Sequence, residues 1–424
     1  MNVSFTYLVL FFSSLVCAFL AFYTFALKKS SINKVYKFSL ASSAFFLLGF
    51  LFADNPLRSE WVSICQGREA LLSGLDPYVL KNLLQTSPNW RSFELNPLFS
   101  FFNFGFCWLS NPWLWSVFSL LLIFFIWASI HAAKLLPMPK NNEDRLRIIS
   151  MLVLGFSSFY FSWEYQSVIL IELMLWIFSL HCFKEKRFSQ AGAALAFVAS
   201  IRIVSLSLFL PFLLLKNQWN GHGRYFWGSA ICVFILTQAL NWIVFPEHMD
   251  AYYSALMGWI PQQKGILVWG ALSEANISLM AALRSLFGVS TLSAILLGLS
   301  YLGLIFAAVT LQWRFMMLKK SSVWEQFHFS LLLLLLLWPR LEAGYLALAL
   351  PSILILSESI LNKQAQTRLF ALVVLAPMIL FVSRKALAPM QAPGVLEKFF
   401  IIAPTLSLLA AVVYIGCHCP QRSE

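Results

Sequence analysis

The sequence predicts an all-α polytopic membrane protein, and three observations support this fold class. Of its 424 residues, 60% are hydrophobic and 11% are charged. The mean hydropathy is +0.76, and a soluble domain needs more polar surface than this composition supplies. Apolar runs close to the ~18 residues that cross a bilayer recur along the whole chain. We therefore expect one integral-membrane domain over residues 1–424.

Thirteen apolar runs predict a bundle of about 12–13 transmembrane helices. The first run lacks a basic leader and a small-residue cleavage site, so we expect a span and not a removed signal peptide. One long apolar stretch is broken at Arg202, and it is either two short helices or one tilted span. The predicted spans are 5–27, 38–53, 112–133, 147–163, 166–183, 189–201, 203–215, 225–245, 290–312, 326–338, 343–360, 369–383 and 399–416.

Alternate loops differ in charge, which predicts the orientation of the chain. One set is rich in lysine and arginine, as cytoplasmic loops are. The other set has nearly balanced charges, and it includes a first periplasmic loop at 54–111 and a second large one at 246–289. The net charge of +12 thus reflects cytoplasmic loops, and we expect no nucleic-acid partner. The basic residues assigned to cytoplasmic loops include Lys184, Lys186, Arg187, Arg224 and Arg314.

The loop 54–111 contains a predicted interfacial helix. Ser59 is a plausible N-cap, and Glu60 falls in the first turn, where a carboxylate suits the helix dipole. Gly74 is expected to end the helix, and Asp76 begins the turn that follows. Glu60 is either a helix-start acid or a general base at the mouth of a membrane cavity. The residues at helical spacing that predict one apolar face are Trp61, Ile64, Cys65, Arg68, Leu71 and Leu72.

Charged residues within apolar segments suggest function, because they are costly in a membrane. Arg202 in "ASIRIVSL" can hold a phosphate through bidentate hydrogen bonds. Alternatively, Arg202 is structural and pairs with Glu172 or Glu164. Arg340 and Glu342 in "WPRLEAGY" can pair with each other, or Arg340 can face the same cavity.

Other polar and aromatic residues are weaker candidates. Gln166 opens a span and Asn276 precedes a short amphipathic helix, so each is a helix cap or a ligand for hydroxyl groups. Tyr78 is one of several outer aromatics, which form an interfacial belt or stack on sugar rings. Cys65 and Cys107 both fall in the first periplasmic loop and could form a disulfide.

Six segments in a fixed order resemble a known family. They begin with an outer acid and "REALLSGLDPY", followed by "NP" about twenty residues later, and continue with "YQSVILIELML", "AGAALAFVASIRIVSLSLFLPFLLLKNQW", "NISLMAALRSLFG" and "WPRLEAGYLALALP". Together they resemble the GT-C superfamily of polyprenyl-phosphate-sugar-dependent glycosyltransferases, in particular the bacterial integral-membrane alpha-mannosyltransferase-like branch. The resemblance covers residues 54–360.

The resemblance implies a GT-C-type helical bundle in the bacterial inner membrane, with periplasmic loops that carry short interfacial helices and an active site facing the periplasm. The implied reaction moves a hexose, most simply mannose, from a polyprenyl-phosphate-linked donor to a lipid or glycan acceptor with inversion. Glu60 or Asp54 would be the base. Arg202, Arg340 and Lys264 would hold the donor phosphate. The residues implied to bind sugar or acceptor are Gln166, Asn276, Tyr78, Asp76 and Arg68.

No cofactor is implied, and a metal ion is allowed but not required, because the sequence shows no dense acid cluster. The tail "CHCP" (417–420) has too few ligands for a closed zinc site. The partners are the donor, the acceptor and membrane lipids. The chain also departs from the family: Glu60 replaces its aspartate, Arg202 replaces its lysine, and the usual Trp and His are missing after Pro339.

Two other functions fit a polytopic membrane protein. A transporter or lipid-sugar flippase would be expected to show paired repeats and acids at the midplane of the membrane. An O-antigen ligase or polymerase would place Arg and His in one large late loop. Neither pattern is prominent here, since the acid-bearing early loop dominates the outer side.

Overall fold

The structure is a computed structural model, and in the part of the chain it describes all regular elements are helices. It describes residues 5–23, 37–38, 41–42, 44–45, 48, 60–77, 97–102, 114, 117, 168–218, 221–257, 279, 291–318, 322–338, 346, 348–349, 351–353, 355–356, 369, 379 and 405–416.

The chain divides into two compact units. One comprises residues 1–55, 134–161 and 277–424, and the other comprises 56–133 and 162–276. The sequence predicts a single domain over 1–424, and that remains a prediction. The unit that contains residues 162–276 also carries the described candidate site residues, so its helices are considered first.

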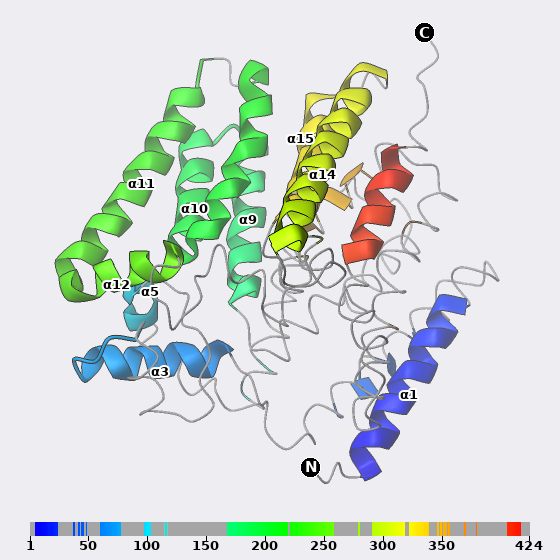
Figure 1. Cartoon of the computed structure of the whole chain (residues 1–424), viewed down its shortest axis with the longest axis horizontal. Helices are drawn as coiled ribbons and strands as arrows, with labels where there is room; N and C mark the ends of the chain where they lie inside the picture. The colour runs from blue at the N-terminus through cyan, green and yellow to red at the C-terminus, as the bar shows by residue number, and fades with distance from the viewer. Residues whose placement is uncertain are drawn as a thin grey trace. The chain divides into compact units, whose positions relative to one another are not determined.

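Four consecutive helices form a bundle in this unit (Figure 1). They are α9 (Ile169–Lys184), α10 (Phe188–Ile201), the 3₁₀ helix η3 (Ile203–Gln218) and α11 (Gly223–Val244). Short connections join them, so the chain reverses direction at each one, and α10 and α11 point the same way. The α9–α10 turn and the start of α11 therefore share one end of the bundle, and Arg202 and the end of α11 share the other.

The contact between α10 and α11 depends on small residues. A Cβ atom at Gly192 would overlap the carbonyl oxygen of Phe226 and lie 2.6 Å from Ser229 Oγ. Ser229 Oγ donates a hydrogen bond to the Ser189 carbonyl oxygen at 2.8 Å. Small residues and interhelical hydroxyl bonds are typical of helix packing in membranes, where lipid competes for apolar surface.

Aromatic rings fill the interior between α9, η3 and α11. Phe212 of η3 packs on Phe226 of α11, with ring centroids 4.8 Å apart, and on Phe183 of α9 at 5.3 Å. Trp176 meets Phe212 edge-on at 5.9 Å. All four side chains are at most 5% exposed, so this cluster is the core of the unit.

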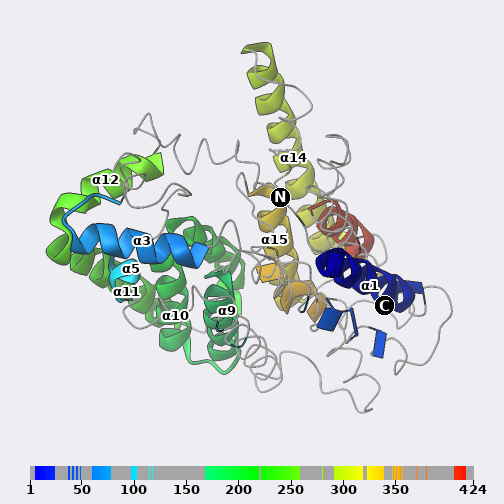
Figure 2. The same cartoon turned by 90° about the horizontal axis from the view of Figure 1, so that it is seen from below.

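Three further helices lie where α11 ends. They are α12 (Pro246–Met257), α5 (Pro97–Phe102) and α3 (Glu60–Leu72). In both views α3 runs crosswise to α9, α10 and α11 at this end (Figures 1 and 2). It packs on α5, which in turn packs on α11 and α12. The helix expected here from the sequence is confirmed, and its interfacial position stays a prediction.

A Schellman motif ends α3, as the glycine predicted. The Leu75 amide donates to the Ala70 carbonyl oxygen at 2.8 Å, and the Gly74 amide donates to the Leu71 carbonyl oxygen at 3.2 Å. Gly74 has φ +69°, where a side chain is disfavoured. The apolar face differs from the prediction, because Leu72 is 55% exposed and Ala70 is buried. The side of α3 that packs is therefore the one that carries Ala70 and not the one that carries Leu72.

The other unit contains α1 (Phe5–Phe22), α14 (Thr291–Leu318), α15 (Val323–Leu337) and a helix over Thr405–Gly416. Phe315 of α14 stacks on Phe329 of α15 at 4.2 Å, and the Tyr301 hydroxyl donates to the Leu337 carbonyl oxygen. A capping box between Ser322 and Glu325 begins α15.

Two described helical segments, Gly223–Val244 and Gly298–Met316, are long and apolar enough to cross a membrane. The break of the long apolar stretch into two helices at Arg202 is confirmed, since that residue is extended (φ −136°, ψ 117°). One assignment is wrong: Arg314 lies inside α14, whose helix continues past the predicted end at 312. Its long side chain can reach water from within a helix, so its charge does not end the element. The other predicted spans are shorter helices or fall wholly or largely outside the described residues.

Candidate functional site

A buried ion pair joins α9 to the break between α10 and η3. Arg202 Nε lies 3.2 Å from Glu172 Oε1, and the two side chains are 6% and 0% exposed. Glu172 is in the first turn of α9, where the helix dipole favours a negative charge. Of the two partners that the sequence left open, Glu172 is confirmed, and Glu164 lies outside the described residues. Arg202 therefore first of all holds α9 against the α10–η3 turn.

A hydroxyl contact between α10 and α11 shows how far the Glu172–Arg202 pair lies from the end of the bundle. The hydroxyl oxygens of Ser200 and Thr237 are 2.6 Å apart, so these residues lie at the same level. Val244, the last residue of α11, is about 10 Å beyond Thr237 at ~1.5 Å per residue. Arg202 is two residues beyond Ser200 and thus lies about 7 Å short of the end of α11.

Asn241 fastens α5 to the last turn of α11. Its Oδ1 accepts a hydrogen bond from the Leu98 amide at 2.9 Å, and its Nδ2 donates to the Thr237 carbonyl oxygen at 2.8 Å. Leu98 belongs to the first turn of α5, whose amides have no partner within the helix. Asn241 is fully buried, so it acts as a cap supplied from another helix.

α12 folds back onto α11 through aromatic contacts. The Tyr253 hydroxyl donates to Gln238 Oε1 at 3.0 Å, and its ring stacks on Trp242 at 6.4 Å. Burial, with a smaller contribution from Tyr253, raises the pKa of the Tyr252 phenol well above its usual value. Tyr252 is thus neutral at physiological pH and is not a candidate base.

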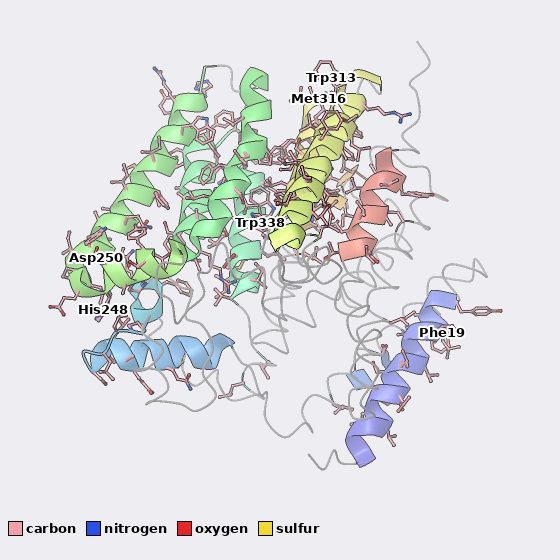
Figure 3. All side chains as sticks on the ribbon, in the orientation of Figure 1. Phe19, His248, Asp250, Trp313, Met316 and Trp338 are labelled. Carbon is pink, nitrogen blue, oxygen red and sulfur yellow. The ribbon has the colours of Figure 1, made fainter. Side chains whose placement is uncertain are left out.

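The two ends of the bundle differ in charge. The basic end, defined by Lys184, Lys186, Arg187 and Arg224, carries exposed cations, with Glu185 among them. The opposite end, which we call the α12 end, carries the Glu172–Arg202 pair and α12 with its exposed acids. Figure 3 shows His248 and Asp250 on α12 at this end. The difference follows the predicted division into cytoplasmic and periplasmic loops.

Few of the predicted site residues fall in the described part of the chain. Glu60 is the first residue of α3, although its side chain is outside the described set. Arg68 and Asp76 are half-buried, on α3 and in the turn after it. Arg202 is buried in its ion pair. The predicted site residues that lie outside the described residues are Asp54, Tyr78, Gln166, Lys264, Asn276 and Arg340.

Cys65 on α3 is disulfide-bonded. The other described cysteines, Cys17, Cys182 and Cys232, are free, so its partner lies outside the described residues. Pairing with Cys107 therefore stays a prediction.

Sequence reasoning missed Asn241 and the helices α5 and α12. A proline at the first helical position was the available signal for both helices, since Pro97 begins α5 and Pro246 begins α12. Glu247 in the first turn of α12 strengthens it. Among the described residues no group of three or more His, Cys, Asp or Glu side chains is placed to hold a metal ion.

No model of a known protein family and no protein of curated function matches this chain. Its function therefore has to follow from its own residues and their arrangement.

Proposed function

We propose that this chain is a polytopic inner-membrane glycosyltransferase that uses a polyprenyl-phosphate-linked sugar. The observation that carries the proposal is the composition of the α12 end: α3, which begins at Glu60, lies across the end of the bundle that holds Arg202 (Figure 2). Transfer of a sugar from a lipid phosphate requires an acid that takes the acceptor proton and a cation that stabilises the leaving phosphate. The α12 end contains residues of both kinds.

The membrane placement is supported by the surface of α11. Its exposed apolar side chains extend from Tyr225 to Val244, about 28 Å at ~1.5 Å per residue. This length matches the ~30 Å hydrocarbon core of a bilayer. Charged residues begin directly outside both limits, with Arg224 on one side and Glu247 on the other. We place the basic end in the cytoplasm and the α12 end in the periplasm.

In the proposed reaction an acceptor hydroxyl attacks the anomeric carbon of the donor sugar. Glu60, with Asp54 as the alternative, takes the hydroxyl proton, while the bond between the anomeric carbon and the phosphate oxygen breaks. The leaving group is the polyprenyl phosphate, and a single displacement inverts the anomeric carbon. Mannose is the first sugar to test, and the acceptor is a lipid or a glycan.

The reaction also needs cations to stabilise the leaving phosphate. Arg340 and Lys264 are assigned this role together with Arg202. Glu172 already compensates the charge of Arg202. Arg202 therefore attracts a bound phosphate less strongly than an arginine without a nearby carboxylate would. Gln166, Asn276, Tyr78, Asp76 and Arg68 remain candidates for contacts to sugar and acceptor hydroxyls.

The test is sugar transfer in membranes from a radiolabelled polyprenyl-phosphate mannose. We expect Glu60→Gln or Asp54→Asn to lower transfer by roughly 10²–10⁴-fold, the usual contribution of a general base. Glu69→Gln is the matched control, because this exposed acid lies on the same helix. If both single variants and their combination keep full transfer, neither acid is the base. Movement of intact lipid-linked sugar across vesicles without transfer would indicate a flippase instead.

A further inference from the structure

The basic end of the bundle has the features of a binding surface for an anion. Lys184, Lys186, Arg187 and Arg224 are all exposed, and Glu185 is the acid among them, so this set carries a net charge of +3. They come from three places in the chain: the last turn of α9, the α9–α10 turn and the first turn of α11.

A run of stacked rings brings these three places together. Phe188 stacks on His222 with ring centroids 6.0 Å apart, and His222 stacks on Tyr225 at 5.8 Å. The Arg224 guanidinium lies 5.0 Å from the centre of the Tyr225 ring. Arg187 directly precedes Phe188, so cations lie at both ends of the stack.

Lys186 occupies a backbone position that favours glycine. Its φ is 60°, and the amides of Lys186 and Arg187 donate to the carbonyl oxygens of Phe183 and Cys182 in a Schellman motif. Glycine would adopt this conformation without the steric cost that a side chain brings. A lysine at such a position suggests that its charge has a use.

The exposed apolar side of α11 begins at this end. Tyr225 is half exposed, and Ile231 and Ile235 continue the same apolar surface further along the helix. Acyl chains can therefore lie along α11 while a headgroup meets the cations above them. Lysine and arginine at the cytoplasmic face of a membrane attract anionic lipids.

We propose that the basic end binds the headgroup of an anionic phospholipid of the cytoplasmic leaflet. Arg187 and Arg224 contact the phosphate from two sides of the aromatic stack, and Lys186 adds a third cation. This inference rests on α11 spanning the membrane, as in the proposed function, and does not depend on the transfer reaction. Its test uses no sugar substrate, so the two proposals can fail separately.

The experiment measures lipid retained by the purified full chain in native mass spectra. Mixed micelles contain equal amounts of phosphatidylglycerol and phosphatidylcholine. We expect preferential retention of phosphatidylglycerol that excess inorganic phosphate does not displace. The double variant Arg187→Gln with Arg224→Gln should lower its retention by about 30-fold, since each cation contributes about fivefold.

Two further variants make the result decisive. Lys37→Gln with Arg314→Gln removes the same charge from exposed residues elsewhere and should leave retention unchanged. Lys186→Gly should lower retention by about fivefold while raising the melting temperature in phosphatidylcholine alone. Equal retention of both lipids, equal losses in the two double variants, or unchanged retention in Lys186→Gly would each overturn the proposal. If the arginine variant does not fold, Lys186→Gly decides.

Discussion

The buried ion pair predicts a large loss of stability when one partner is removed. Glu172→Gln keeps the shape of the side chain but leaves the Arg202 guanidinium without its carboxylate. At 3.2 Å and an effective dielectric constant of about 20, the two charges attract by about 5 kcal/mol. Breaking a buried pair from one side usually costs about 3–5 kcal/mol. We therefore expect Glu172→Gln to lower the free energy of unfolding by about 3 kcal/mol or more.

The measurement is unfolding of the purified full chain in detergent, followed by tryptophan fluorescence. The double variant Glu172→Gln with Arg202→Met removes both charges and should recover most of the loss, because an uncompensated charge is the main cost. Glu185→Gln is the control, an exposed acid just after α9, and should change stability by less than about 0.5 kcal/mol. A stable Glu172→Gln protein, or a double variant no better than the single one, would contradict the structural role of the pair.

Three other substitutions test local features of the same unit. Gly192→Ala places a methyl group against the Phe226 carbonyl oxygen, and thermal unfolding should show that the free energy of unfolding falls by about 1–3 kcal/mol. An unchanged melting temperature would rule out the close approach of α10 and α11. Gly74→Ala meets no atom within 4 Å, so chemical denaturation should show only the conformational cost of φ +69°, about 1 kcal/mol. Asn241→Leu removes the side-chain oxygen to which the Leu98 amide donates. We expect the free energy of unfolding to fall by about 1–3 kcal/mol with faster proteolysis at α5, and wild-type proteolysis would refute the cap.

Local signals in the sequence predicted several elements well. The extent of the apolar runs placed α9, α10 and α11 to within three residues at each end. Gly74 gave the end of α3, because only glycine readily takes the left-handed conformation that closes a Schellman motif. Arg202 gave the break between α10 and η3, because its charge interrupts an apolar stretch.

Contacts between distant residues were beyond such reasoning. Asn241 and Leu98 are 143 residues apart, and an amide within an apolar helix gives no sign of its partner. The pairing of Arg202 with Glu172 depends on how the first turn of α9 faces the α10–η3 connection, which spacing along the chain does not give. The burial of Ala70 in place of Leu72 likewise follows from the packing of α3 and not from its spacing.

The approach of α10 to α11 at Gly192 also limits how this unit can move. With a backbone carbonyl of one helix against the backbone of the other, no side chain between them can rearrange to let them part. Hydroxyl bridges on both sides of Gly192, at Ser229 and at Ser200, hold the pair in register. α10 and α11 should therefore travel as one rigid body.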